Sequence, residues 1–155
     1  MNPKRILALD YGHRRVGLAI SDPLCITTTP LKTLLFPRPI RTQQERTIFL
    51  LHHIQNLLRD YNVSTIVLGM PKNMSGTLSQ MAKEVQKVQQ SLQKHFPNIQ
   101  IILWDERLST LQAERELKRL QFSFKKRQQK IDAMAAQLIL QNFLDANSLH
   151  KKKNE

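Results

Sequence analysis

The chain has 155 residues, of which 41% are hydrophobic, and this composition suits one folded domain and excludes a disordered protein. Its 24 Lys and Arg against 12 Asp and Glu give a formal net charge of +12, which favours a polyanionic partner, nucleic acid before an anionic membrane surface. The single cysteine, Cys25, excludes an internal disulfide, and no hydrophobic run reaches membrane-spanning length. These features predict a cytoplasmic protein that does not act at a membrane.

Three β-strands are predicted in the N-terminal third of the chain. Residues 5–10 and 16–21 form a hairpin around Gly12, and residues 26–36 form a third strand, in which Pro30 indicates a sheet edge or a bulge.

Helices and strands alternate after residue 42. A helix is predicted over 42–61, with its apolar stripe at Ile48, Leu51, Ile54, Leu58 and Tyr61. A buried strand over 64–70, a helix over 79–95 and a strand over 99–104 follow. Ser109 and Gln112 fit the capping box of another helix, residues 125–130 are expected to be a loop, and the last helix is predicted from Asp132 to Ala146.

This order predicts the α/β class, with a mixed central sheet of three antiparallel strands followed by β/α alternation and helices on both faces. The ribonuclease H-like fold is one such architecture. Residues 1–147 are expected to form a single domain, and residues 148–155 a basic flexible tail.

Three acidic residues stand at the ends of predicted elements. Asp10 ends the first strand, Glu106 follows the last strand, and Asp132 opens the final helix. Each also has a structural explanation: a turn at Asp10, a solvated position or a pair with Arg107 for Glu106, and a helix N-cap at Asp132. If the first and last strands are close in the sheet, however, the three carboxylates converge. Such a cluster suits a pair of divalent cations, which take oxygen ligands and catalyse phosphodiester cleavage.

Five motifs lie along nearly the whole chain: "LALDYGHRRVGLAISDP", "ITTTPL", "VLGMPKNMSG", "WDERLST" and "IDAMAAQLILQNFLD". In this order they resemble the YqgF family of Holliday-junction-resolvase-like proteins and pre-16S ribosomal RNA nucleases. The resemblance implies a ribonuclease H-like fold and an endonuclease that depends on Mg2+ or Mn2+. It also implies that the protein trims the 5′ end of precursor 16S ribosomal RNA during ribosome biogenesis.

The resemblance assigns the catalytic and metal-binding roles to Asp10, Glu106 and Asp132. Asp105 is the rival of Glu106, because strand alternation sends the two side chains to opposite faces, and the family pattern selects the glutamate.

Other side chains near these motifs have more than one interpretation. Asp22 fits a turn, Tyr11 could stack on a base or pack over the hairpin, and His13 could assist catalysis or be solvated. The middle loop departs from the family pattern, because Ser75 and Ser79 stand where an acid and a glycine are common, and this puts its handling of the substrate in doubt.

Polar and basic side chains close to the acids are predicted to hold the nucleic-acid backbone, although a solvated charge run is the alternative explanation. These residues are Arg14, Arg15, Lys72, Asn73, Arg107, Lys125, Lys126, Arg127 and Lys130. The expected partners are precursor ribosomal RNA or branched DNA, together with ribosomal particles, and the expected state is a monomer or weak homodimer.

Three other functions fit part of the sequence. The first motif also resembles the phosphate loop of actin-like ATPases and sugar kinases, but those proteins need two such domains and this chain supplies one. A Holliday-junction-type DNA resolvase shares the predicted fold and acids. A nucleic-acid-binding protein without catalysis shares the fold and the basic face, but it has no use for the three acids.

Overall fold

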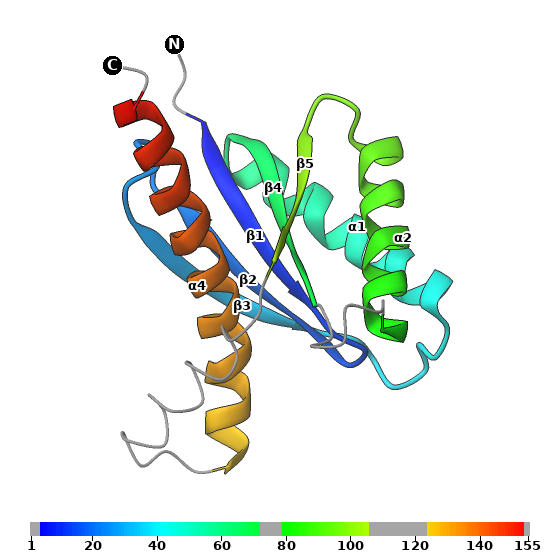
Figure 1. The fold of residues 1–155 in the computed structure, drawn as a ribbon. Coiled ribbons are helices and arrows are strands. Elements are labelled where there is room, and N and C mark those ends of the chain that lie inside the picture. Colours follow the sequence, from blue (N-terminus) through cyan, green and yellow to red (C-terminus); the bar gives the residue numbers. More distant parts are fainter. Residues whose placement is uncertain (1–3, 72–78, 106–123, 154–155) are drawn as a thin grey trace.

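The computed structural model describes residues 4–71, 79–105 and 124–153, which form a five-stranded sheet with helices on both faces (Figure 1). In the last helix, side chains are described for residue 131 and for residues 134–148. The elements are β1 (Arg5–Tyr11), β2 (Arg15–Ser21), β3 (Thr28–Leu35), α1 (Gln43–Asp60), β4 (Val63–Met70), α2 (Gln80–His95), β5 (Gln100–Asp105) and α4 (Phe124–Lys153).

The sheet has the strand order β3-β2-β1-β4-β5. β1 pairs antiparallel with β2, and β2 pairs antiparallel with β3, whereas β1, β4 and β5 run parallel to one another. This confirms the predicted mixed sheet. Because parallel strands end on the same side, the carboxyl ends of β1, β4 and β5 lie along one edge, which we call the C-terminal edge.

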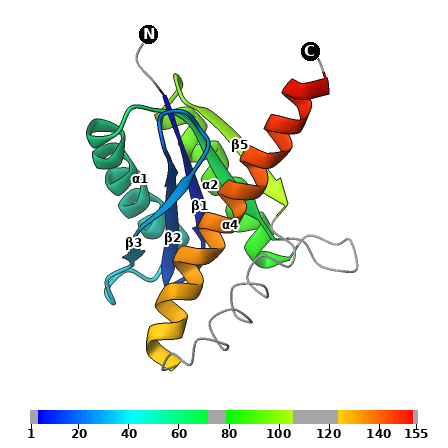
Figure 2. The ribbon, with the colours of Figure 1, turned by 90° about the vertical axis from the view of Figure 1, so that its left-hand side faces the viewer.

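The two faces of the sheet have separate cores, because side chains alternate along each strand. Leu7 and Leu9 of β1 pack in the larger core with residues of α1 and α2, whereas Ala8 packs in a second core with residues of α4. Figure 2 shows α1 and α2 on one side of the strands and α4 on the other. Any residue of β1 can therefore be assigned to a face by its position in the sequence.

β3 forms one border of the sheet and is irregular along its length. Pro30, which has no N–H group, stands opposite Ala19, and the register shifts between the pairs Val16–Leu34 and Leu18–Leu31. The shift places one extra residue on β3, which is a β-bulge. Both features that Pro30 suggested, an edge and a bulge, are present.

Side chains cap α1 and α2 at their first residues. The Thr42 hydroxyl accepts a hydrogen bond from the Glu45 amide at 3.1 Å, and the Ser79 hydroxyl accepts one from the Ala82 amide at 3.0 Å. The departure from the family pattern at Ser79 therefore supplies a helix N-cap. The predicted apolar stripe of α1 is wrong at Ile48, which is 69% exposed.

The last helix is longer than predicted. α4 begins at Phe124, so residues 125–130 are helical rather than a loop, and Asp132 lies within the helix rather than at its N-cap. The physical reason is that Lys, Arg and Gln are good helix formers and no Gly or Pro interrupts the segment. Charge alone does not indicate a loop.

α4 also continues to Lys153, into the segment 148–155 that was expected to be a tail. The domain boundary at residue 147 stays a prediction. Of the helices that the structure describes, none combines the length and the apolar character that crossing a membrane requires.

Candidate metal and nucleic-acid site

Asp10 lies at the C-terminal edge, one residue before the end of β1. It is half-buried, pairs with Gly17 of β2, and follows Ala8 by two residues, so strand alternation assigns it to the face that α4 covers. A tight turn follows, in which the Gly12 amide donates to the Arg15 carbonyl oxygen at 2.9 Å. A Cβ at Gly12 would approach that oxygen to 2.9 Å, so this position requires glycine.

The helix position of Asp132 lies at the same end of the contact between α4 and β1. Ala8 of β1 and Ala136 of α4 belong to one core cluster and are fully buried. α4 runs antiparallel to β1 (Figure 1). Asp10 follows Ala8 by two residues and position 132 precedes Ala136 by one helical turn, so both lie beyond this cluster toward the C-terminal edge. The backbone thus brings two of the three predicted acid positions to one region.

The other predicted site residues fall into three groups. Arg14 is exposed in the β1–β2 turn and Arg15 begins β2. For the basic residues before Asp132 the structure gives only the helical backbone, and the remaining positions lie outside the described residues. The residues with a described backbone only are Lys125, Lys126, Arg127 and Lys130, and the residues outside the described part are Lys72, Asn73, Glu106 and Arg107.

Within the described residues, no group of three or more His, Cys, Asp or Glu side chains could hold a metal ion. Of the predicted triad, only the Asp10 side chain belongs to that part of the chain.

Asp22 holds a turn, as the sequence predicted. Its carboxylate accepts hydrogen bonds from the backbone amides of Thr27, Ile26 and Leu24 at 2.8, 2.7 and 3.2 Å. These bonds, with Thr27 contributing most, hold the pKa of the Asp22 carboxyl below its ordinary value. All the observed contacts of Asp22 are therefore explained by the turn.

A cluster of four side chains around the buried Glu84 lies at the same edge, on the face covered by α1 and α2. We call Tyr11, His13, Arg46 and Glu84 the Glu84 cluster. Glu84 is 6% exposed, and its Oε1 accepts from the Tyr11 hydroxyl at 2.8 Å and from the Arg46 Nη2 at 2.6 Å. Its Oε2 accepts from the His13 Nε2 at 2.7 Å. The cluster therefore ties the end of β1 and the following turn to the first turns of α1 and α2.

Burial and hydrogen bonding shift the titration of this cluster. Burial alone would raise the pKa of the Glu84 carboxyl, but hydrogen bonds from Arg46 and Tyr11 outweigh it and lower that pKa below its ordinary value. Burial, together with Glu84 as acceptor, raises the pKa of Tyr11 to about 12, against the opposing effect of Arg46. Glu84 is thus ionised and Tyr11 neutral at physiological pH.

We expect Tyr11→Phe to remove a phenol that ionises at about pH 12. Because the folded pKa exceeds the ordinary value of 10.0, the stability that Tyr11 contributes is complete below pH 10 and is lost as the pH rises through about 12. The difference in unfolding free energy between wild type and variant should therefore shrink over that range. Phenolate absorbance measures the ionisation, and urea unfolding measures the stability. If the absorbance step that wild type shows and Tyr11→Phe lacks is centred near pH 10, the Tyr11–Glu84 hydrogen bond does not form in solution.

Only part of this cluster could be anticipated from the sequence. Tyr11 is 4% exposed and packs edge-on against Phe36 with ring centroids 6.2 Å apart, which confirms packing over base stacking. His13, although its side chain is 54% exposed, is paired with Glu84. Glu84 directly precedes Val85 of the buried stripe of α2, and this position was the sequence sign of the cluster. A charged residue beside an apolar stripe needs a partner when it is buried.

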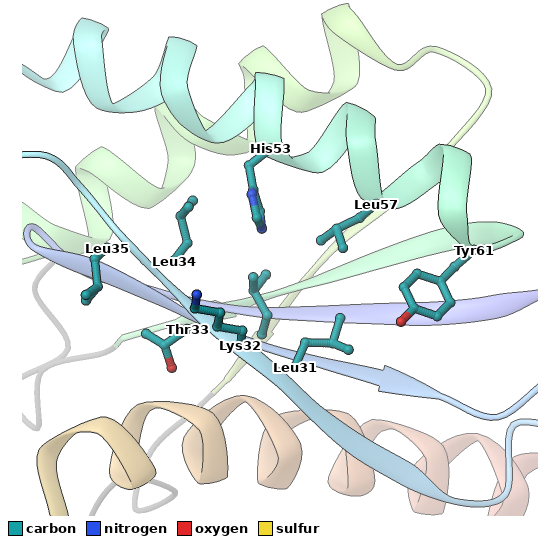
Figure 3. A pocket seen from close by; sticks show the side chains of 9 residues that line it. Leu31, Lys32, Thr33, Leu34, Leu35, His53, Leu57 and Tyr61 are labelled. Atoms are coloured by element: carbon teal, nitrogen blue, oxygen red, sulfur yellow. The ribbon is translucent and has the colours of Figure 1, made fainter. Parts of the chain in front are cut away.

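A separate hollow of about 560 Å³ lies between β3 and α1 (Figure 3). His53 and Leu57 reach from α1 toward Leu31 and Leu34 of β3. Burial, with a smaller effect of His52, lowers the pKa of His53 and favours its neutral form. Since none of the described residues that line this hollow carries a carboxylate, they do not suit a divalent metal.

Comparison with known proteins places this geometry in context. A family model described as Holliday junction resolvase, RuvX, matches residues 4–146. A protein of Bacillus cytotoxicus named "Putative pre-16S rRNA nuclease" is 44% identical over 142 residues, covering 92% of this chain and 98% of that protein. A protein of the same name from Desulfitobacterium hafniense is 43% identical over 141 residues, covering 91% of this chain and 92% of its own.

The fold has a similar solved structure as well. The RuvC protein of Thermus thermophilus, solved in complex with a Holliday junction substrate, superposes with a TM-score of 0.56 at 13% sequence identity. The match covers 94% of this chain and 96% of that chain, and it confirms the ribonuclease H-like fold. With the family model covering nearly the whole chain and relatives above 40% identity, the protein belongs to the RuvX family, the family also called YqgF.

Proposed function

We propose that this protein is a divalent-metal-dependent endonuclease that processes the 5′ end of precursor 16S ribosomal RNA in the cytoplasm. The observation that carries the proposal is the position of Asp10, on the α4 face of β1 at the edge where the parallel strands end. The name of the 44% identical relative supplies the substrate.

The three proposed metal ligands are Asp10, Glu106 and Asp132. Position 132 lies three and four residues before Ala135 and Ala136, which are fully buried in the helix face that packs on the sheet. This spacing supports a role for Asp132 on the same side of the sheet as Asp10.

The packing of β5 supports Glu106 over Asp105. Ile102 and Trp104 pack in the core on the α4 side, whereas Leu103 packs on the side of α1 and α2. Asp105 shares the alternation of Leu103, and Glu106 follows Trp104 by two residues. Asp105 therefore lies on the face opposite to Asp10, and this favours Glu106 as the proposed ligand.

The donor chemistry fits Mg2+ or Mn2+. All three proposed ligands are carboxylates, and hard divalent cations take oxygen ligands. When bound, such ions activate water as the nucleophile and stabilise the departing oxygen. The three carboxylates would hold and neutralise the ions, and the hydrogen bond from Tyr11 to Glu84 would keep the end of β1, with Asp10, in place.

Basic side chains around the edge are proposed to hold the RNA backbone. Arg14 is exposed in the turn that follows Asp10, and Lys125, Lys126, Arg127 and Lys130 occupy the turns of α4 that precede Asp132. Ammonium and guanidinium groups bind phosphates without reading the bases, so specificity comes from RNA shape or from ribosomal particles. Lys72, Asn73, Arg15 and Arg107 complete the proposed set.

A cleavage assay on two substrates tests this function. Precursor 16S ribosomal RNA and a branched DNA junction are incubated with the protein and Mg2+ or Mn2+, with and without a chelator. We expect cleavage near the 5′ end of the RNA that stops when the chelator is added. If only the DNA junction is cleaved, the substrate is branched DNA and not precursor ribosomal RNA. If neither substrate is cleaved in the presence of metal, the protein binds nucleic acid without catalysis.

A further inference from the structure

A groove of about 600 Å³ lies between α1 and α2, on the face of the sheet opposite α4. Its lining is rich in hydrogen-bond donors: two ammonium groups, three amides and two hydroxyls. These residues are Lys87, Lys94, Gln43, Gln44, Gln90, Thr47 and Ser91. Ile48 and Leu51 supply the aliphatic part, and this explains where the exposed Ile48 side chain lies.

Three lysines form one stripe along α2, and two of them, Lys87 and Lys94, line this groove. Lys83, Lys87 and Lys94 are all exposed, and their spacing of four and seven residues keeps them within about 40° around the helix axis. The stripe spans about 16 Å, and phosphates of one duplex strand follow each other at about 3.4 Å along the axis. A row of this length can therefore meet several phosphates of one strand.

Carboxylates do not compensate this charge. Among the described residues, no carboxylate lines the groove and no ion pair joins the three ammonium groups to an acid. Of the acids on the two helices, Glu84 is buried against Arg46, Glu45 bonds the Thr42 hydroxyl, and Asp60 is at the far end of α1. The groove is open to a polyanion.

The stripe starts at the C-terminal edge. Lys83 directly precedes Glu84, whose carboxylate accepts from Tyr11, the residue after Asp10. α1 and α2 both begin on the side of the sheet where β1 and β4 end (Figure 1). A nucleic acid at Asp10 that passes around the β1–β2 turn would continue along this stripe.

We propose that the groove between α1 and α2 is a second nucleic-acid-binding surface, which holds the phosphate backbone of the substrate beyond the point of cleavage through Lys83, Lys87 and Lys94. This inference rests on the proposed function for its substrate, but it concerns binding alone. It adds residues that none of the sequence motifs contains.

The test is the salt dependence of RNA binding, measured in chelator so that no cleavage occurs. A fluorescein-labelled RNA hairpin is titrated by anisotropy with wild type, with Lys87→Gln/Lys94→Gln, and with the control Lys4→Gln/Lys32→Gln. Lys4 and Lys32 are exposed at the start of β1 and in β3, so the control changes the net charge equally away from the groove.

Loss of two phosphate contacts should reduce the slope of log K against log salt by about 1.4–1.8 and weaken binding about tenfold at physiological salt. The control should stay close to wild type. If the groove and control variants bind RNA equally well, the proposal is overturned. Cleavage is scored separately, so a protein that binds through the groove and cuts nothing refutes the nuclease function and leaves this surface standing.

Discussion

The Asp10→Asn variant is expected to lose at least about 100-fold in metal-dependent cleavage of precursor ribosomal RNA. Loss of a residue that only hydrogen-bonds a metal ligand already costs about 10- to 100-fold, and Asp10 is proposed as a direct ligand. The amide has nearly the shape of the carboxylate but lacks its charge. Binding of RNA in chelator should be unchanged or tighter, because one negative charge is removed from the binding face.

Two further substitutions locate the site. Glu106→Gln should lose activity like Asp10→Asn, whereas Asp105→Asn, which makes the same change of charge one residue earlier, should keep it. Loss in Asp105→Asn with retention in Glu106→Gln would move the ligand to the other face of β5. Equal cleavage by wild type and Asp10→Asn would end the proposal of a carboxylate site at this edge.

The Glu84→Ala variant is expected to lose about 3–5 kcal/mol of unfolding free energy, because it leaves the Arg46 guanidinium and the Tyr11 hydroxyl without their acceptor. The Arg46 side chain is 13% exposed, so water only partly replaces the lost carboxylate. Domains of this size are stable by about 5–15 kcal/mol, so the loss is a large fraction. Urea unfolding followed by circular dichroism measures it.

A double variant separates the cost of an unpaired buried charge from the other effects of the truncation. Replacing Arg46 and Glu84 together by Met should restore part of the loss, since no unpaired charge is then buried. His13→Ala is the milder comparison, because its side chain is half exposed. If the unfolding free energy of Glu84→Ala is no lower than that of His13→Ala, the Glu84 cluster does not stabilise the fold.

The effect of Glu84 should also depend on pH. The folded pKa of Glu84 lies below the ordinary value of 4.5, so its contribution is complete above that pH and is lost as the pH falls through the folded pKa. The difference between wild type and Glu84→Gln should accordingly shrink in acid.

The spacing of apolar residues along the chain explains which helices and strands could be predicted from the sequence. The strands and the first two helices have clear periods of two or 3.6 residues, so their positions followed from the sequence. α4 was less predictable, because residues 125–130 are charged and carry no apolar stripe, while their helix propensity is high. Ile48 fitted the helical period but lies where α1 leaves the core and faces the groove.

The site was predictable only in part. Asp10 could be proposed as a site residue from the sequence because it stands at the end of an apolar run, shortly before a glycine turn. The Glu84 cluster joins residues 11, 13, 46 and 84, which are far apart in the sequence and come together only when β1, α1 and α2 pack. The lysine stripe of α2 has an ordinary amphipathic pattern, and its position beside a groove depends on how α1 crosses it.

The irregular outer strand has a consequence for a protein that gathers on polyanions. Many copies attracted to one RNA reach a high local concentration, and a straight border strand would then offer its free backbone groups to a neighbour. Pro30 and the bulge of β3 interrupt that row of donors and acceptors. Crowding on the substrate should therefore not lead these molecules to aggregate by pairing through β3.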